Sequence, residues 1–416
     1  MTCACQNRSR RQSLWVCCLL AVVLLAGYCT SVAWSQTAED KEYKRSLRPF
    51  PSAPRSQYVV LGFNDLGMHC MNQDFSQLCI LPPYNNLHAQ VIQRGEEPHI
   101  LKRNVTVRYS IPSNTVSTTK TNFWNYDKLL FGVDLPPNIG LTGHGLSGTM
   151  TPTGRGDWES TGIPVTPLND AMQLDAYPLS RIEAVVNQRV VASTRAVVPV
   201  SWEISCNLCH QPSGNPKTVD SNILATHDRL HGTKLVQSQP VLCGSCHADP
   251  ALGTPGTPGV KNLSAAMHSS HATRMQPVAN LGNSCYACHP GFNTKCQRDI
   301  HFSKGIHCTQ CHGDMAAVGS PNRRPWLDEP KCATCHQQRR PTFAFEEPGK
   351  NFKDSRGHGG VMCASCHGSP HAITPTVTPQ DNVQAIQLQG FAGTIRKCTV
   401  CHTQQPEDGF FHSIED

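Results

Sequence analysis

The chain has 416 residues, of which 38% are hydrophobic and 16% charged, with 22 cysteines, 20 histidines and a formal net charge of +6. This length indicates two or three domains. No long basic run occurs, so the charge pattern argues against a nucleic-acid-binding protein.

Residues 1–35 are typical of a secretory signal peptide. Three arginines precede the apolar run 14–28, and residues 33–35 offer a small-residue cleavage site. We therefore expect an exported protein, periplasmic or extracellular, with residues 36–55 as a linker. If the signal is not cleaved, residues 14–34 are nearly long enough to serve as a membrane anchor. Cleavage removes five cysteines and leaves 17.

Residues 56–205 are expected to form an all-β, β-sandwich-like domain. The β-branched runs 57–63, 104–111 and 194–204 have strand length, and Gly, Pro and Asn punctuate the rest. Residues 181–194 predict a hairpin that turns at Asn187-Gln188. The last strand leads directly to Cys206, so this domain should pack against whatever follows it.

The stretch Gly67-Met-His-Cys-Met71 is the chemically notable part of this domain. We favour a disulfide between Cys70 and Cys79. Copper binding by the Met, His and Cys side chains is the alternative, and His69 is also a candidate ligand for a neighbouring cofactor. Cys296 then remains as the odd cysteine.

The pattern C-x-x-C-H occurs seven times in residues 206–416, and it is typical of covalent c-type haem attachment. The two cysteines would form thioethers with the haem, and the histidine would bind its iron. The cysteines, as candidate haem-binding residues, and the histidines, as metal ligands, are Cys206, Cys209 and His210; Cys243, Cys246 and His247; Cys285, Cys288 and His289; Cys308, Cys311 and His312; Cys332, Cys335 and His336; Cys363, Cys366 and His367; and Cys398, Cys401 and His402.

Zinc ribbons are the alternative for paired cysteines, but they do not require a histidine directly after the second cysteine. About one residue in twenty is histidine. Seven such histidines by chance would have a probability on the order of 10⁻⁹, so the haem motif is strongly favoured. The predicted cofactors are therefore seven covalent c-type haems (heme c).

Large apolar side chains make up about 20% of residues 201–416, against about 35% of residues 56–200. So few apolar side chains bury too little area to offset chain entropy. We expect residues 206–416 to be a haem-cored cytochrome c domain of loops and short α-helices.

Nine histidines after residue 200 lie outside the motifs. A haem iron has two axial positions, and the motif histidine fills only one of them, so each haem can take a second histidine. Residues 220–231 predict a helix that begins at Asp220 or Ser221 and stops at Gly232, which places two of these histidines on one face. Enough histidines exist that methionine ligands are not needed. The predicted distal ligands are His227, His231, His268, His271, His301, His358 and His371, with His307 and His412 in reserve.

The export signal, the seven motifs and the interspersed histidines make the chain resemble the large secreted multihaem c-type cytochromes of metal-respiring and related bacteria. Phrases such as N-D-L-G-M-H-C-M and P-V-L-C-G-S-C-H-A-D add to the resemblance. It implies electron transfer in the periplasm or at the cell surface.

The sequence thus predicts an electron conduit rather than an enzyme. Expected partners are other redox proteins, such as quinol-linked or periplasmic cytochromes and terminal acceptors. The alternative is a multihaem oxidoreductase that acts on a small nitrogen or sulfur substrate at one haem with an open distal site. A third hypothesis is a homo-oligomer or filament formed through the β domain.

Overall fold

The computed structural model describes residues 56–275, 281–407 and 412. The predicted signal peptide and linker lie outside these residues. All described residues belong to one compact unit, Phe50–Asp416. Within the described ranges, no helix is long and apolar enough to cross a membrane.

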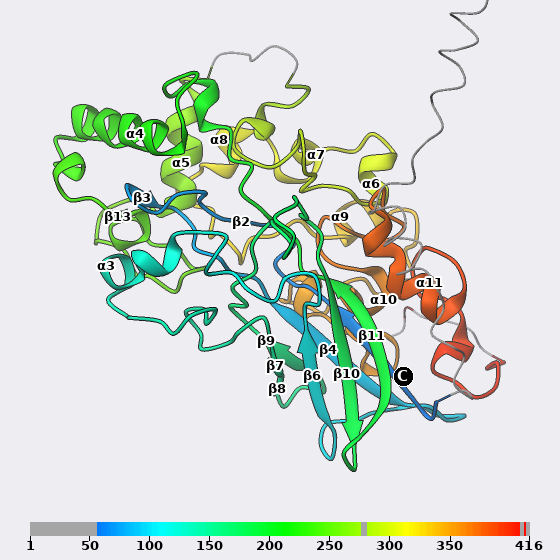
Figure 1. The fold of residues 1–416 in the computed structure, drawn as a ribbon. Helices are drawn as coiled ribbons and strands as arrows, with labels where there is room; N and C mark the ends of the chain where they lie inside the picture. The colour runs from blue at the N-terminus through cyan, green and yellow to red at the C-terminus, as the bar shows by residue number, and fades with distance from the viewer. Residues whose placement is uncertain (1–55, 276–280, 408–411, 413–416) are drawn as a thin grey trace, which may run out of the picture. The chain divides into compact units, whose positions relative to one another are not determined.

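Two antiparallel sheets form the N-terminal β region, residues 56–205 (Figure 1). The first has the strand order β1-β4-β9-β8, with β5 paired to β4, and the second has the order β11-β10-β6-β7. Their bounds are β1 (Tyr58–Phe63), β4 (Leu87–Gln93), β5 (His99–Ile100), β8 (Thr151–Pro152) and β9 (Trp158–Ser160) for the first sheet, and β6 (Thr106–Ser110), β7 (Ser147–Thr149), β10 (Leu179–Val186) and β11 (Arg189–Val197) for the second.

The two sheets share one hydrophobic core. In β6 the side chains alternate, so that Val107 and Tyr109 are buried while their neighbours face outward. They meet Val91 and Ile182 in the same cluster. Gly62 in β1 lies close to the second sheet, because a Cβ there would come within 2.6 Å of the Ile182 side chain. A larger residue at this position would require the Ile182 side chain to move.

The predicted hairpin is confirmed. Strands β10 and β11 pair antiparallel, with Val186 opposite Arg189. The two residues between them have positive φ angles, 48° at Asn187 and 62° at Gln188. This is the two-residue turn whose twist matches that of the flanking strands.

Two short parallel pairs connect the β region to the segment that carries the motifs, residues 206–412. Strand β2 (His69–Cys70) pairs with β12 (Val200–Ser201), and β3 (Leu78–Cys79) pairs with β13 (Val241–Leu242). β12 lies just before the first motif, and β13 ends directly before Cys243 of the second. The β region therefore holds the chain at the entry to both motifs.

Helices are short outside α4, which has 16 residues. It begins at Pro216, four residues before the predicted Asp220, because the Asn215 side chain accepts a hydrogen bond from the Thr218 amide and proline suits the first helical position. It ends before Gly232, as predicted. The helices are α3 (Asp127–Phe131), α4 (Pro216–His231), α5 (Leu263–Ala272), α6 (Ile300–Ser303), α7 (Cys308–His312), α8 (Met315–Val318), α9 (Ala333–His336), α10 (Cys363–His367) and α11 (Val383–Gln389).

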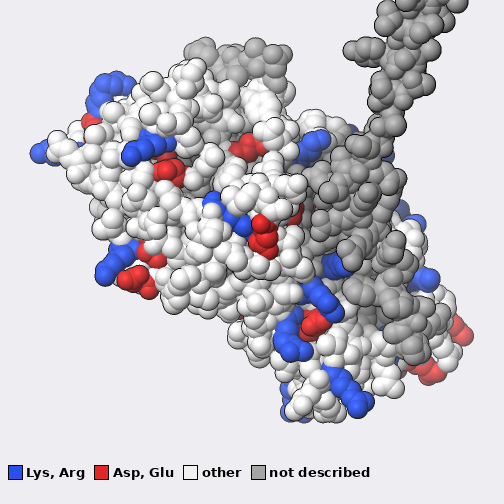
Figure 2. Space-filling model, in the orientation of Figure 1, with Lys and Arg blue, Asp and Glu red and all other residues white. Residues whose placement is uncertain are grey.

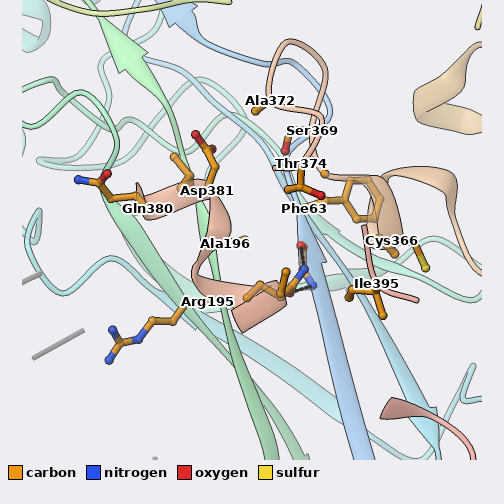
Figure 3. A pocket seen from close by; sticks show the side chains of 16 residues that line it. Phe63, Arg195, Ala196, Cys366, Ser369, Ala372, Thr374, Gln380, Asp381 and Ile395 are labelled. Carbon is orange, nitrogen blue, oxygen red and sulfur yellow. Dashed lines mark hydrogen bonds between the residues drawn. The ribbon is translucent and has the colours of Figure 1, made fainter. Parts of the chain in front are cut away.

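Helix α11 is fastened to both sheets by one side chain. The amide of Gln384 accepts hydrogen bonds from the Gly62 N–H (2.7 Å) and the Thr194 hydroxyl (2.8 Å), and donates one to the Gly62 carbonyl (3.0 Å). A cavity of about 40 Å³ lies beside this contact, with Phe63, Cys366 and Ile395 in its lining (Figure 3). It has room for water but not for a large ligand. We therefore interpret it as a packing gap between the sheets and the C-terminal helices, not as a binding site.

Candidate functional site

Each of the seven C-x-x-C-H motifs folds as a single helical turn. In a helix, residues three and four apart lie on the same face, so both sulfurs and the imidazole of a motif point to one side. In five motifs the histidine N–H donates to the carbonyl of the first cysteine over 2.8–3.0 Å. The turns are Cys206–Leu208, Cys243–Ser245, Ser284–Ala287, Cys308–His312, Ala333–His336, Cys363–His367 and Cys398–Val400.

Every motif histidine faces one histidine from outside the motifs. No histidine of the described chain serves two motifs in this way. The pairs, with the distances between ring centres, are His210–His271 (6.4 Å), His247–His227 (6.3 Å), His289–His268 (6.1 Å), His312–His371 (5.9 Å), His336–His301 (6.1 Å), His367–His412 (5.8 Å) and His402–His358 (6.0 Å). We number these as sites 1 to 7, in the order of the motifs along the chain.

The spacing within the pairs suits a metal between two imidazoles. A metal–nitrogen bond is about 2.0–2.1 Å long and the ring centre lies about 1.2 Å behind the nitrogen, so two opposed imidazoles on one metal have centres about 6.4 Å apart. Aromatic rings also pack directly at about 4.5–7 Å. The distance alone is therefore not specific, and the one-to-one pairing is the informative feature.

Hydrogen bonds leave Nε2 of the paired rings available. In ten of the fourteen histidines, Nδ1 lies within hydrogen-bonding distance of a protein atom. Such a bond at one ring nitrogen sets the tautomer and orients the other nitrogen for a metal. The partners are Asn222 for His210, Thr233 for His227, Lys261 for His247, Ser264 for His268, Met267 for His271, Asp299 for His301, Thr394 for His367, Cys296 for His371, Glu96 for His402 and Ala344 for His412.

Burial keeps several of these rings neutral. Burial, and after it the charge of neighbouring histidines, lowers the pKa of His289, His312 and His367 to about 4. A neutral imidazole is the form that binds a metal. These three rings are therefore ready to act as ligands at neutral pH.

The histidines of the β region do not join the pairs. Nε2 of His69, the nitrogen that would face a metal, instead lies 2.8 Å from the Pro82 carbonyl. His88 forms ion pairs with Asp65 (3.5 Å) and Asp157 (3.3 Å). Burial lowers the pKa of His88, but the hydrogen bonds to both carboxylates outweigh it and raise that pKa to about 9.

Six of the seven predicted distal histidines face a motif histidine, and His231 does not. Its ring lies 4.7 Å from that of His227, which already faces His247. The two share a face of α4 because they are four residues apart, and His231 is exposed. The i, i+4 spacing shows that two rings share a face but not which of them meets a partner.

His412, which was held in reserve, faces His367 instead. Its ring stacks on Phe343 with 4.9 Å between centres, and its Nδ1 lies 3.0 Å from the Ala344 carbonyl. These contacts fix a residue whose place near the end of the chain suggested fraying. The F-A-F sequence at 343–345 could have indicated such a dock for an aromatic side chain.

His307, the other reserve, caps a helix. Its backbone N–H donates to the Gln310 side chain over 2.9 Å at the start of α7, and its ring packs on Phe302. His301 and His307 therefore play different parts although only five residues separate them.

Sites 2, 1 and 3 follow one another in space through two helices. On α4, His227 belongs to site 2 and Asn222 contacts His210 of site 1. On α5, His271 belongs to site 1 and His268 to site 3. Each helix thus links two neighbouring sites.

Sites 3, 4 and 5 are neighbours through their cysteines. A hydrogen bond from the Cys308 thiol lowers the pKa of Cys285 to about 7, which places sites 3 and 4 in contact. Burial and then the Cys335 thiol raise the pKa of Cys311, so site 5 lies next to site 4.

Sites 5, 6 and 7 continue the series. Burial, then Glu346 and the Cys363 thiol, raise the pKa of Cys332 to about 12. Burial and then Cys401 raise the pKa of Cys366 to about 12. The spatial order of the sites is therefore 2-1-3-4-5-6-7.

The expected disulfide between Cys70 and Cys79 is absent, because both are free thiols. They lie in different surroundings: Cys70 is near Cys296 and Glu203, and Cys79 is near Cys243 and Asp249. Burial raises the pKa of both thiols. Cys296 itself has its sulfur 4.0 Å from Nδ1 of His371.

Two cysteines and a pair of imidazoles at each site are a donor set that a porphyrin-bound iron would accept. Within the described ranges, no group of three or more His, Cys, Asp or Glu side chains could hold a metal by itself. Two opposed imidazoles suffice when a porphyrin supplies the other ligands. The cysteines for its attachment lie on the same face of each turn as the motif histidine.

No model of a protein family matches this chain, and neither a curated protein nor a solved structure matches it.

Proposed function

We propose that this protein is an exported electron-transfer protein with seven covalent c-type haems, each held by two cysteines and two histidines. The observation that carries the proposal is the one-to-one pairing of the seven motif histidines with seven others. Each thioether forms when a cysteine S–H adds across a haem vinyl group, so no atom is lost. When bound, each haem supplies a one-electron redox centre.

The residues of the chain give these centres their ligands and their order. The two paired imidazoles would hold each haem from either side and would leave no place there for a substrate. Nδ1 hydrogen bonds hold the rings, as between His247 and the Lys261 carbonyl (2.8 Å). The order 2-1-3-4-5-6-7 keeps each centre beside the next, so electrons enter and leave at sites 2 and 7.

The partners are other redox proteins, such as quinol-linked or periplasmic cytochromes and terminal acceptors. On the face seen in Figure 2, basic and acidic side chains are interspersed among uncharged ones. Such a surface suits small, transient contacts. Export by the N-terminal signal places the protein in the periplasm or outside the cell.

The test is to purify the holoprotein and measure its haem content, its mass and its electron paramagnetic resonance spectrum in the fully oxidised state. We expect seven haems per chain, all low-spin, with optical spectra that agree. A high-spin component of about one haem in seven would reveal a vacant iron and favour the oxidoreductase instead. Zinc in place of haem would overturn the proposal.

A further inference from the structure

The hydrogen bonds to the paired histidines are not equivalent. Of the ten Nδ1 contacts, nine involve a carbonyl, amide, hydroxyl or thiol group. The tenth joins His301 Nδ1 to a carboxylate oxygen of Asp299 at 3.0 Å. Among these ten contacts, site 5 thus has the only charged partner.

Asp299 is held firmly in this position. Its side chain is only 7% exposed. One oxygen contacts His301, and the other accepts a hydrogen bond from the Phe302 N–H over 2.9 Å at the start of α6. Because both oxygens are engaged and little solvent reaches them, the charge is weakly screened.

A carboxylate at this place changes what the imidazole does to a metal. It accepts a hydrogen bond from Nδ1–H and so makes the ring a stronger electron-pair donor at Nε2. Its negative charge also stabilises the more positive, oxidised state of a nearby iron. Both effects lower a reduction potential, for which second-shell hydrogen bonds are an established control.

We propose that Asp299 is a positioning residue that acts through His301 to lower the reduction potential of site 5. This inference rests on the proposed function. Site 5 lies inside the order 2-1-3-4-5-6-7, so it separates four sites from two. Transfer across the molecule therefore passes through this site.

The opposing explanation is that Asp299 only caps α6. Asp299→Asn and Asp299→Ser separate the two, because Asn and Ser cap helices about as well as Asp but carry no charge. Asp314→Asn is the matched control: Asp314 caps α8 by accepting from the Ala317 N–H over 2.8 Å. It carries the same change of charge at a helix start, beside site 4.

The experiment is a spectroelectrochemical titration of each holoprotein, with haem content and spin state measured on the same samples. In the Asn and Ser variants we expect the potential of one haem component, that of site 5, to rise by roughly 59 mV, which is a tenfold change in the oxidised-to-reduced ratio for one electron. The Asp314→Asn variant should leave that component in place.

The inference would be overturned if the redox titration curves of both Asp299 variants superimposed on the wild-type curve. An equal shift of the same component in the Asp314→Asn variant would also overturn it. If an Asp299→Ala variant shifts this component but the Asn and Ser variants do not, Asp299 acts only as the cap of α6. A wild type with fewer than seven haems or with a high-spin iron would instead overturn the proposed function. If the Asn variant fails to accumulate, the Ser variant decides.

Discussion

The rings of His367 and His412 face each other with 5.8 Å between their centres, although one closes the sixth motif and the other lies near the end of the chain. His412, the last described residue, thus lies beside a motif far back along the chain. Phe343 and Phe345 pack on His412 and hold it there. The sequence alone suggested His231 as a partner for a motif histidine, whereas the structure places His412 beside one.

His412→Ala should leave one haem iron without a distal ligand. We expect a high-spin signal from about one haem in seven, with the haem content unchanged because the cysteines still attach it. His231→Ala is the matched control and should remain fully low-spin, since His231 contacts His227 and no motif histidine. Electron paramagnetic resonance of the oxidised proteins measures both. The reverse result would restore His231 as the ligand.

Arg298→Ala should strongly destabilise the protein. Arg298 is completely buried and donates to both carboxylate oxygens of Asp381, at 2.6 and 2.9 Å. Its removal leaves a buried unpaired charge, which costs about 3–5 kcal/mol. Urea unfolding followed by circular dichroism measures the loss.

The control for this variant is Arg324→Ala. Arg324 pairs with Asp328 four residues on, but its side chain is 72% exposed. Such a surface pair contributes at most about 1 kcal/mol. If the two alanine variants lose the same free energy, burial is not the reason for the effect at Arg298.

The His88 cluster should make stability depend on pH. The folded-state pKa of His88, about 9, lies above its ordinary 6.5, so the stabilisation is complete below pH 6.5 and is lost as the pH rises through 9. The pKa values of Asp65 and Asp157 are lowered, mainly by their hydrogen bonds to His88 against the effect of burial. The stabilisation that these two carboxylates contribute is present above pH 3.8 and is lost only as the pH falls below that value.

We therefore expect the wild type to exceed His88→Gln in stability by about 3 kcal/mol between pH 4 and 6.5, with the difference vanishing towards pH 9. Urea unfolding at a series of pH values measures it. His99→Gln, at an exposed position of β5, should follow the wild-type profile. A difference between wild type and His88→Gln that stays constant from pH 6.5 to 9 would contradict the prediction.

Without haem, residues 206–412 should not hold their fold. The largest apolar cluster joins residues of the β region, such as Val91 and Val107, whereas the clusters around Ile395 and Met362 are small. Expression without haem attachment, followed by limited proteolysis, should give cleavage after residue 205 and a more resistant N-terminal fragment. Uniform resistance of the haem-free chain would show that the apolar contacts suffice.

Part of the fold followed from local signals. The hairpin at Asn187-Gln188 and the helix end at Gly232 were predicted because each depends on a few adjacent residues. The predicted start of α4 was four residues too late. The cap is Asn215, which precedes a proline, and proline is more often taken as a sign that a helix ends. The Cys70–Cys79 disulfide was wrong because each thiol belongs to a different short parallel pair.

The sequence by itself determined where the seven C-x-x-C-H turns lie, since this pattern places two sulfurs and an imidazole on one face of a single turn. It also supplied enough histidines for a second ligand at each. Only the tertiary structure decided which histidine faces which motif, that His412 and not His231 faces a motif histidine, and that the sites follow the order 2-1-3-4-5-6-7. Those contacts join residues far apart in the chain, and their geometry depends on how helices, loops and sheets pack together.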